Sequence, residues 1–220
     1  MTIPILASLK RILLPGGTSP QTVLFGPGAG AVMDIDFAHQ ARMYFGLYET
    51  EIAPHLRRLV RPGYRCFDVG ANVGYHSLTL ARLSGGPVVA FEPDPAAGAI
   101  LRANIAHNNF AIRIVSAAVG ARDDANTITL DRAAAENFIP DLIKIDIEGA
   151  ETDALTGAMR LLRERKPDFI IETHGRALED DCVAILRGNG YAVRAIAPRR
   201  FFAETRPAQH NGWLVAEARS

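Results

Sequence analysis

From Arg61 to the C-terminus, short apolar runs alternate with segments of helical periodicity, and this alternation constrains the fold more than any other feature of the sequence. Runs such as Val88–Phe91 and Phe169–Ile171 are apolar at every position, as strands are when helices cover both faces of a parallel sheet. Repeated strand–helix units of this length predict a doubly wound α/β fold with a mostly parallel sheet. Ligands of such folds bind beyond the carboxyl ends of the strands, so the candidate functional residues are sought there.

The expected elements follow from this pattern. Strands are expected at Tyr64–Val69, Val88–Phe91, Ile112–Ser116, Leu142–Asp146, Phe169–Thr173, Tyr191–Ile196 and Gly212–Ala216. Helices are expected at Tyr75–Leu83, Pro95–Asn108, Ala150–Arg165 and Ala177–Arg187.

The first 60 residues lack this alternation and predict a small N-terminal cap. A helix is expected over 1–14, followed by a break at Pro15–Pro20. Strands at Thr22–Phe25 and Ala31–Phe37 would form a hairpin, and Pro54 would divide a helical stretch over 39–60. We therefore predict a cap at 1–60 and a ligand-binding domain at 61–220.

Composition excludes several function classes. Lys+Arg and Asp+Glu are each 24, whereas a nucleic-acid partner would favour a basic excess. The two cysteines, Cys66 and Cys182, form no motif for a disulfide framework or a zinc cage, and a reducing cytoplasm is the expected location. No run reaches the roughly 18 apolar residues of a membrane span, so stable membrane insertion is not expected.

The first strand leads into a glycine-containing turn, Asp68–Leu78 (DVGANVGYHSL). Glycine at 70 and 74 would let the backbone approach a ligand closely at the start of a helix. A dinucleotide fingerprint would need glycines at 70, 72 and 75, where Asn72 and Tyr75 stand, which disfavours a nicotinamide-dependent oxidoreductase. A plain strand-to-helix turn is the alternative, although Asp68 is a carboxylate that is costly to bury without a partner.

Two further acidic positions follow strands. Glu92 lies 22 positions after Gly70, near the spacing at which an acid accepts hydrogen bonds from ribose hydroxyls. Its alternative role is to cap the helix that starts near Pro95. Asp146 follows the fourth strand, and Lys144 within that apolar strand requires an anionic partner.

These segments resemble the FkbM-type family of S-adenosylmethionine-dependent methyltransferases. The matching stretches are Asp68–Leu78, Phe91–Pro95 (FEPDP) and Leu142–Glu151 (LIKIDIEGAE), with support from Gly46–Glu51 (GLYETE) and Pro167–His174 (PDFIIETH). The resemblance implies a class I, Rossmann-like methyltransferase that uses S-adenosylmethionine. The loop at 68–74 would hold the methionine end, Glu92 the ribose, and Ser116 would lie near the adenine. The expected cofactor-binding residues are Asp68, Gly70, Ala71, Asn72, Gly74, Glu92, Pro93, Ser116 and Asp146.

The resemblance also implies methylation of a hydroxyl on a small molecule or glycan. A neutral hydroxyl needs a base to take its proton, and the candidates are His174, Glu172, Asp146 and Glu148. The same four side chains could bind a divalent cation, but their spacing is not diagnostic and no metal ligand is assigned. A cofactor-binding protein without catalysis is the remaining alternative. The other histidines, His39, His55, His76, His107 and His210, are expected to be surface or packing residues.

Overall fold

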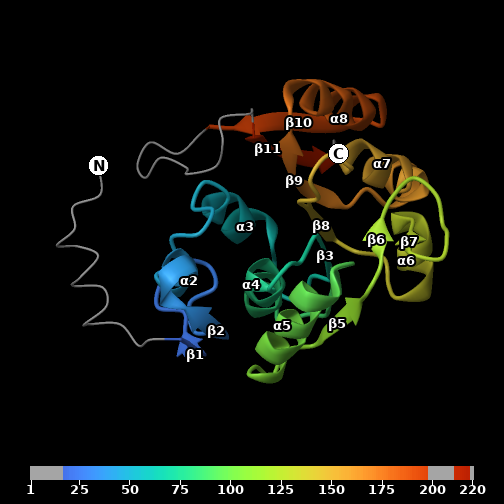
Figure 1. Ribbon diagram of the computed structural model, residues 1–220. Coiled ribbons are helices and arrows are strands. Elements are labelled where there is room, and N and C mark those ends of the chain that lie inside the picture. The colour runs from blue at the N-terminus through green and yellow to red at the C-terminus, as the bar shows by residue number, and fades with distance from the viewer. Residues whose placement is uncertain (1–16, 198–210, 219–220) are drawn as a thin grey trace.

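The computed structural model describes residues 17–197 and 211–218, and the helix expected over 1–14 lies outside them (Figure 1). The main sheet contains, from edge to edge, β5 (Ile112–Val115), β4 (Val88–Phe91), β3 (Cys66–Val69), β8 (Leu142–Ile145), β9 (Asp168–His174), β11 (Asn211–Ala218) and β10 (Tyr191–Ile196). Neighbours from β5 to β9 are parallel, whereas β11 is antiparallel to both β9 and β10. This arrangement confirms the doubly wound, mostly parallel sheet.

Strand order reverses between β3 and β8. The chain runs outward from β3 through β4 to β5 on one side, and from β8 to β9 on the other. Side chains that follow β3 and β8 therefore meet at the switch point, where doubly wound folds bind their ligands.

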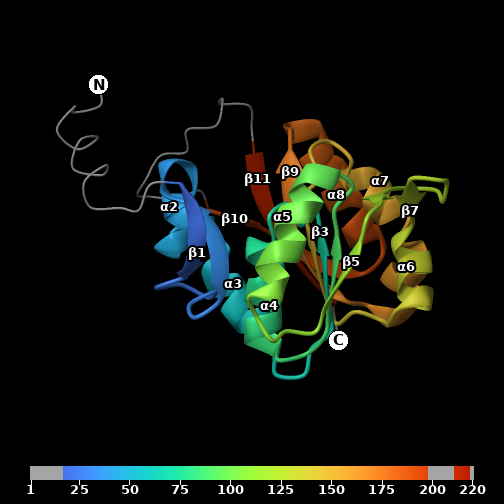
Figure 2. The same ribbon diagram turned by 60° about the horizontal axis from the view of Figure 1, so that its bottom comes forward.

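Helices cover both faces of this sheet (Figure 2). They are α4 (Tyr75–Ser84), α5 (Pro95–Ala106), α6 (Leu130–Glu136), α7 (Glu151–Thr156), a short π-helical turn at Leu161–Arg165, and α8 (Arg176–Gly188). One face of the strands, including Phe67, Val89 and Ile143, contributes buried side chains to the largest apolar cluster. The alternate positions, including Cys66, Val88 and Leu142, are buried in a second cluster on the other face.

The single helix expected over 150–165 is wrong, because α7 ends at Thr156. A segment that the sequence did not predict, comprising β6 (Ala118–Val119), β7 (Thr127–Ile128) and α6, docks at this point. Asp131 donates its backbone N–H to the Gly157 carbonyl at 2.9 Å, and its carboxylate accepts from the N–H groups of Arg160 and Leu161, at 2.8 Å each. These bonds satisfy backbone groups that have no intrahelical partner where the helix is interrupted.

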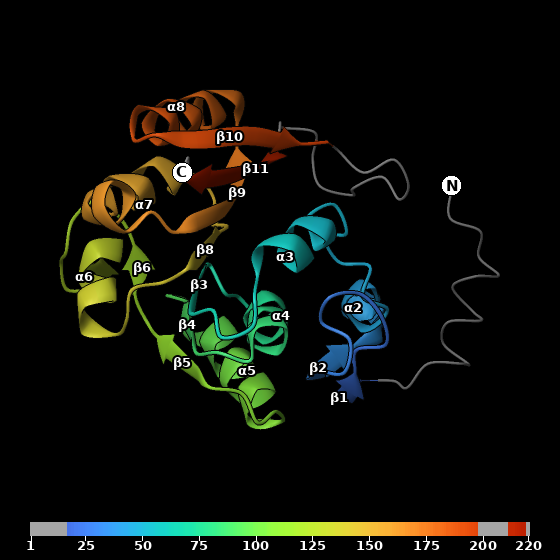
Figure 3. The same ribbon diagram turned by 180° about the vertical axis from the view of Figure 1, so that it is seen from behind.

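The N-terminal elements are a hairpin of β1 (Thr18–Thr22) and β2 (Val32–Asp36), followed by α2 (Phe37–Tyr44) and α3 (Ala53–Leu59), seen from behind in Figure 3. The first strand of the hairpin was expected at Thr22–Phe25, but β1 begins at Thr18, inside the expected break at Pro15–Pro20, and ends at Thr22. Pro20 is compatible with pairing to Asp34 because β1 is an edge strand. Pro54 lies in the first turn of α3 and so separates it from α2, as predicted.

This hairpin is attached to the helices of the main sheet. Asn104 of α5 and Asn108, just after the end of α5, accept hydrogen bonds from the N–H groups of Asp34 and Val32 at 2.7 and 2.9 Å, which satisfies the open edge of β2. Met33 and Ile35 of β2 are buried in one apolar cluster with Leu78 of α4. The division of the chain at residue 60 stays a prediction. Within the described part of the chain, no helix combines the length and the apolar character needed to cross a bilayer.

Candidate functional site

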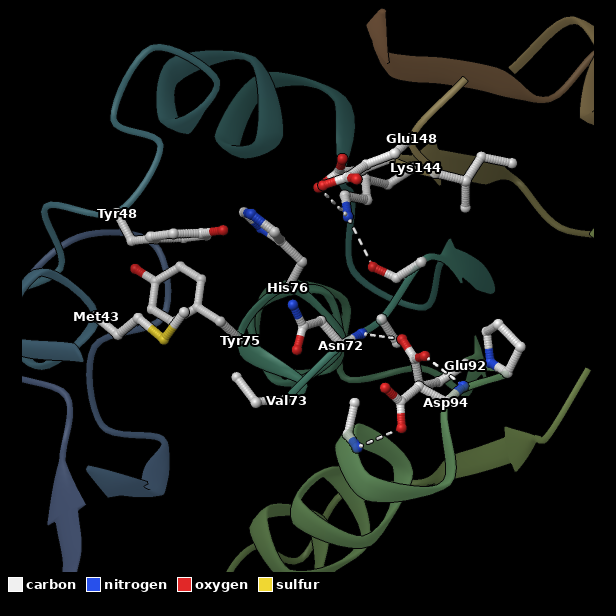
Figure 4. Close-up of a pocket in the computed structure, with 16 residues that line it drawn as sticks. Met43, Tyr48, Asn72, Val73, Tyr75, His76, Glu92, Asp94, Lys144 and Glu148 are labelled. Carbon is white, nitrogen blue, oxygen red and sulfur yellow. Dashed lines mark hydrogen bonds and ion pairs between the residues drawn. The ribbon is translucent and has the colours of Figure 1, made fainter. Parts of the chain in front are cut away.

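A cavity of about 650 Å³ opens at the carboxyl ends of the strands, next to the switch point (Figure 4). This volume lies within the range of small-molecule and cofactor sites. Figure 4 shows Tyr48, Tyr75 and His76 on one side of the cavity and Glu92 and Asp94 on the other. The lining residues are Met43, Tyr48, Gly70, Ala71, Asn72, Val73, Tyr75, His76, Glu92, Pro93, Asp94, Ala97, Lys144, Asp146, Ile147 and Glu148.

The glycine-containing turn after β3 forms the floor of the cavity and is fixed by backbone contacts. Gly70 has φ +78°, and a Cβ there would lie 1.8 Å from the Asp146 carbonyl oxygen. The N–H groups of Gly70 and Ala71 both donate to the Phe91 carbonyl, at 3.1 and 3.0 Å. Gly70 is therefore required for the close approach of two parallel strand ends, and this contact is present without a ligand.

Glu92 connects this turn to the segment after β4. It is buried, and its two carboxylate oxygens accept the backbone N–H groups of Asn72 at 2.7 Å and Asp94 at 2.8 Å. The alternative role as a helix cap belongs to Asp94, whose side chain accepts from Ala96 and Ala97 at the start of α5. Glu92 thus holds its carboxylate on the cavity wall by two backbone bonds.

Lys144 has the anionic partners that its place in an apolar strand required. Its Nζ lies 3.4 Å from Asp68 Oδ1 and 3.3 Å from Asp146 Oδ2, and it donates to the Gly70 carbonyl at 3.3 Å. Burial lowers the pKa of Lys144, but the charges of Asp146 and Asp68 outweigh burial and raise it. Ser77 donates to the other oxygen of Asp68 at 2.5 Å. The buried ammonium therefore stays charged and ties β3 to β8.

His174 lies at the end of β9, beside Asp146. Its Nδ1 is 2.6 Å from Glu151 Oε1, and its Nε2 is 3.8 Å from Asp146 Oδ1. The hydrogen bond to Glu151 raises the pKa of His174, against the effect of burial, with help from the charge of Glu172. For Asp146, burial raises the pKa, but the Lys144 charge and other contacts lower it below its usual value. Glu151 is therefore the residue that orients the imidazole.

The cavity receives only some of the residues that the sequence proposed. Gly70, Ala71, Asn72, Glu92, Pro93, Asp146 and Glu148 line it, whereas Asp68, Gly74, Ser116, Glu172 and His174 do not. Asp68 is fully buried behind Lys144, and Ser116 is exposed.

Gly74 requires a specific correction. It was expected to lie where the backbone and the cofactor nearly touch, but a Cβ there would lie 2.5 Å from Leu101 Cδ1 in the core. Its φ of +94° at the start of α4 explains the glycine. The structure therefore gives Gly74 a conformational role.

His76 was expected to be a packing residue, yet it lines the cavity together with Tyr48. Its Nε2 is 2.6 Å from Glu49 Oε2, and both side chains are buried. Burial raises the pKa of Glu49, but the charge and hydrogen bond of His76 outweigh burial and lower it. The signal was the GLYETE stretch, which contains both Tyr48 and Glu49 and was used only as support for the family.

We compared the chain with known protein families and with curated proteins. The model of the methyltransferase FkbM domain matches residues 115–206. Residues 115–206 therefore resemble an FkbM methyltransferase domain. This match confirms, over that part of the chain, the resemblance to the FkbM-type family that the motifs predicted. No curated protein matches the chain significantly.

Solved structures show the fold of this chain. The methyltransferase FkbM from Methylobacillus flagellatus KT is 21% identical with a TM-score of 0.58, over 84% of this chain and 56% of that chain. The precorrin-6y C5,15-methyltransferase from Geobacter metallireducens GS-15 is 15% identical with a TM-score of 0.56, over 78% and 90%. A SAM-dependent O-methyltransferase from Thermotoga maritima is 17% identical with a TM-score of 0.53, over 78% and 65%. These neighbours confirm the class I methyltransferase fold.

Proposed function

We propose that this FkbM-type chain transfers the methyl group of S-adenosylmethionine to a hydroxyl of a small molecule or glycan. The observation that supports this proposal best is the cavity itself. It lies at the switch point, with the turn at 70–73 and Glu92 on one side and Asp146 and Glu148 on the other. The cytoplasm is the proposed location, which the two buried free cysteines fit.

In this proposal the cofactor lies along the turn after β3. Glu92 would accept hydrogen bonds from the ribose hydroxyls, because a carboxylate has about four lone-pair sites and only two are used by Asn72 and Asp94. Gly70, Ala71 and Asn72 would face the methionine end of the cofactor. Asp146 would face the charged groups of that end. The negative charge of Asp146 also suits a positively charged sulfonium nearby.

The acceptor would enter beside Tyr48, His76, Asp146 and Glu148. Bound S-adenosylmethionine would supply an activated methyl group, and its sulfur would leave as a neutral thioether once the acceptor oxygen had taken that methyl group. The hydroxyl proton must pass to a base, and Asp146 and Glu148 are the proposed acceptors that line the cavity. His174 fits this role less well than the sequence suggested, because it does not line the cavity and its Nδ1 is held by Glu151.

Calorimetry tests the cofactor half of the proposal. S-adenosylmethionine or its demethylated product should bind, and nicotinamide dinucleotides should not. Glu92→Ala should weaken binding by about ten- to hundredfold, since it removes charge-assisted hydrogen bonds from the ribose. Glu136→Ala, which removes an exposed acid paired with Arg132, is the matched control and should bind as the wild type does.

Unchanged affinity in Glu92→Ala would overturn the ribose assignment. The acceptor half is tested with S-adenosylmethionine that carries an isotope-labelled methyl group and a panel of hydroxyl-bearing sugars and small molecules. Nuclear magnetic resonance of the product shows whether the label is on oxygen. A label on carbon or nitrogen would replace the O-methyltransferase proposal.

A further inference from the structure

Three side chains that are far apart in sequence converge beside the cavity, at the ends of two parallel strands. Asp146 directly follows β8, while Glu172 and His174 lie in the last part of β9. The pairing of Ile145 with Ile171 brings Asp146 level with Glu172. One ligand atom from each of the three side chains lies within 4.8 Å of the others.

We propose that Asp146, Glu172 and His174 form a binding site for a divalent transition-metal cation such as Mn²⁺. Two carboxylates and one imidazole are a donor set that suits Mn²⁺, Fe²⁺ or Zn²⁺. The ion would lie at the edge of the cavity, because Asp146 is one of its lining residues.

The orientation of His174 supports this site. Its Nδ1 is held at 2.6 Å by Glu151 Oε1, which leaves Nε2 facing Asp146 Oδ1 across 3.8 Å. That gap is too long for a hydrogen bond. Imidazoles that ligate metals commonly have their second nitrogen fixed by a carboxylate in this way, which sets the tautomer and the ring direction.

The spacing of the donor atoms is close to what an ion needs. Two donors that each lie about 2.1 Å from one ion are separated by about 3 Å when adjacent and about 4.2 Å when opposite. The gap of 3.8 Å between His174 Nε2 and Asp146 Oδ1 falls inside that range, and side-chain rotations would bring the full set, which lies within 4.8 Å, around one ion.

Charge favours a cation at the same place. Asp146, Glu151 and Glu172 bring three carboxylates into a small, largely buried volume, and Glu151 is fully buried. Lys144 neutralises one oxygen of Asp146 and is shared with Asp68, so it cannot balance the whole cluster. Glu151 Oε2 is buried with no hydrogen-bond partner among the described residues. An additional positive charge beside these groups would therefore be stabilised.

A cation at this position would also bear on the chemistry, a role that rests on the proposed function. A hydroxyl that enters the cavity next to the ion would release its proton more readily. Glu148, which lines the cavity beside Asp146, would be the nearest carboxylate to receive that proton.

The binding experiment uses the full chain, freed of metal with a chelator and dialysed, and titrated with Mn²⁺ alone while electron paramagnetic resonance follows the free ion. One saturable site per chain is expected. His174→Ala and Glu172→Gln should each weaken Mn²⁺ binding at least tenfold, and Glu151→Gln, which changes a positioning residue, about 10- to 100-fold. Pulsed spectra of bound Mn²⁺ should show coupling to an imidazole nitrogen that is lost in His174→Ala.

His107→Ala is the matched control, because His107 also contacts a carboxylate, Asp34, but lies away from the cavity. It should leave the Mn²⁺ affinity unchanged. Thermal melts identify variants that fold, and if Glu172→Gln does not, the partly exposed His174 decides the outcome. Absence of saturable binding, or equal affinity in His174→Ala, would overturn the site. Cofactor binding to the metal-free chain is measured separately, so failure of the metal site is distinguishable from failure of the proposed function.

Discussion

The two sides of the cavity hold their polar groups in place by different means. On the side of the glycine-containing turn, Glu92 bonds to backbone N–H groups of Asn72 and Asp94, and Gly70 touches the neighbouring strand end through its backbone. On the side of β8 and β9, charged side chains from distant segments balance one another, as Lys144 does between Asp68 and Asp146. The first side therefore depends on backbone shape and the second on charge, so different substitutions should damage each.

Removal of the buried charge on Lys144 should have the largest effect. Lys144→Met keeps much of the side-chain volume but leaves two carboxylates without their cation, and loss of one member of a buried pair costs about 3–5 kcal/mol. Denaturant unfolding measures the free energy of unfolding. The control is Arg132→Met, which breaks an exposed pair with Glu136 and should cost about 1 kcal/mol or less. Similar losses in the two variants would show that charge does not hold the β8–β9 side.

The turn side is tested by a pair of glycines. Gly70→Ala should lower the free energy of unfolding by about 3 kcal/mol, because a Cβ meets the Asp146 carbonyl and φ is positive. Gly98→Ala in α5 is the matched control, since nothing lies within 4 Å of its Cβ position. There the change should raise stability by about 0.5–1 kcal/mol through helix propensity. A stable Gly70→Ala protein would mean that the close approach of the strand ends is not required.

The sequence predicted the strands and the turn side of the cavity well, because both depend on local signals. Val88–Phe91 and Tyr191–Ile196 have the bounds that the apolar runs predicted. Gly70, Asn72 and Glu92 lie within one strand–helix–strand unit of β3, α4 and β4, so spacing along the chain was enough to bring them together.

The β8–β9 side could be predicted only in part. Asp146 and Lys144 were recognised from their strand, but the contact of His174 with Glu151, on another element, was not predicted. His76 was assigned to packing, because its partner Glu49 is 27 positions distant. The helix over 150–165 failed for the same reason, since a docking segment that lies earlier in the chain divides it. Each error concerns a contact between distant segments, which periodicity along one element does not encode.

The smallest expected effect concerns the buried Glu49–His76 ion pair, whose histidine lines the cavity. The pKa of Glu49 is lower in the folded chain than its usual value of 4.5, because His76 outweighs burial. A lowered folded pKa gives stability that is fully present above the unfolded pKa and is lost as pH falls through the folded pKa. The free energy of unfolding should therefore drop as pH falls below about 4.5, and part of that drop should come from Glu49.

Glu49→Gln isolates this contribution, because the amide does not titrate. Unfolding by urea at pH 7 and at a series of values below 4.5 gives the loss of stability for the wild type and the variant. The variant should start less stable at neutral pH and lose less on acidification, so the two curves converge. Glu136→Gln, on the exposed face of α6, should instead run parallel to the wild type. If the curve for Glu49→Gln stays parallel to that of the wild type at all pH values, the pair contributes packing and no charge balance. The charge-dependent part of the cavity would then be limited to the β8–β9 side.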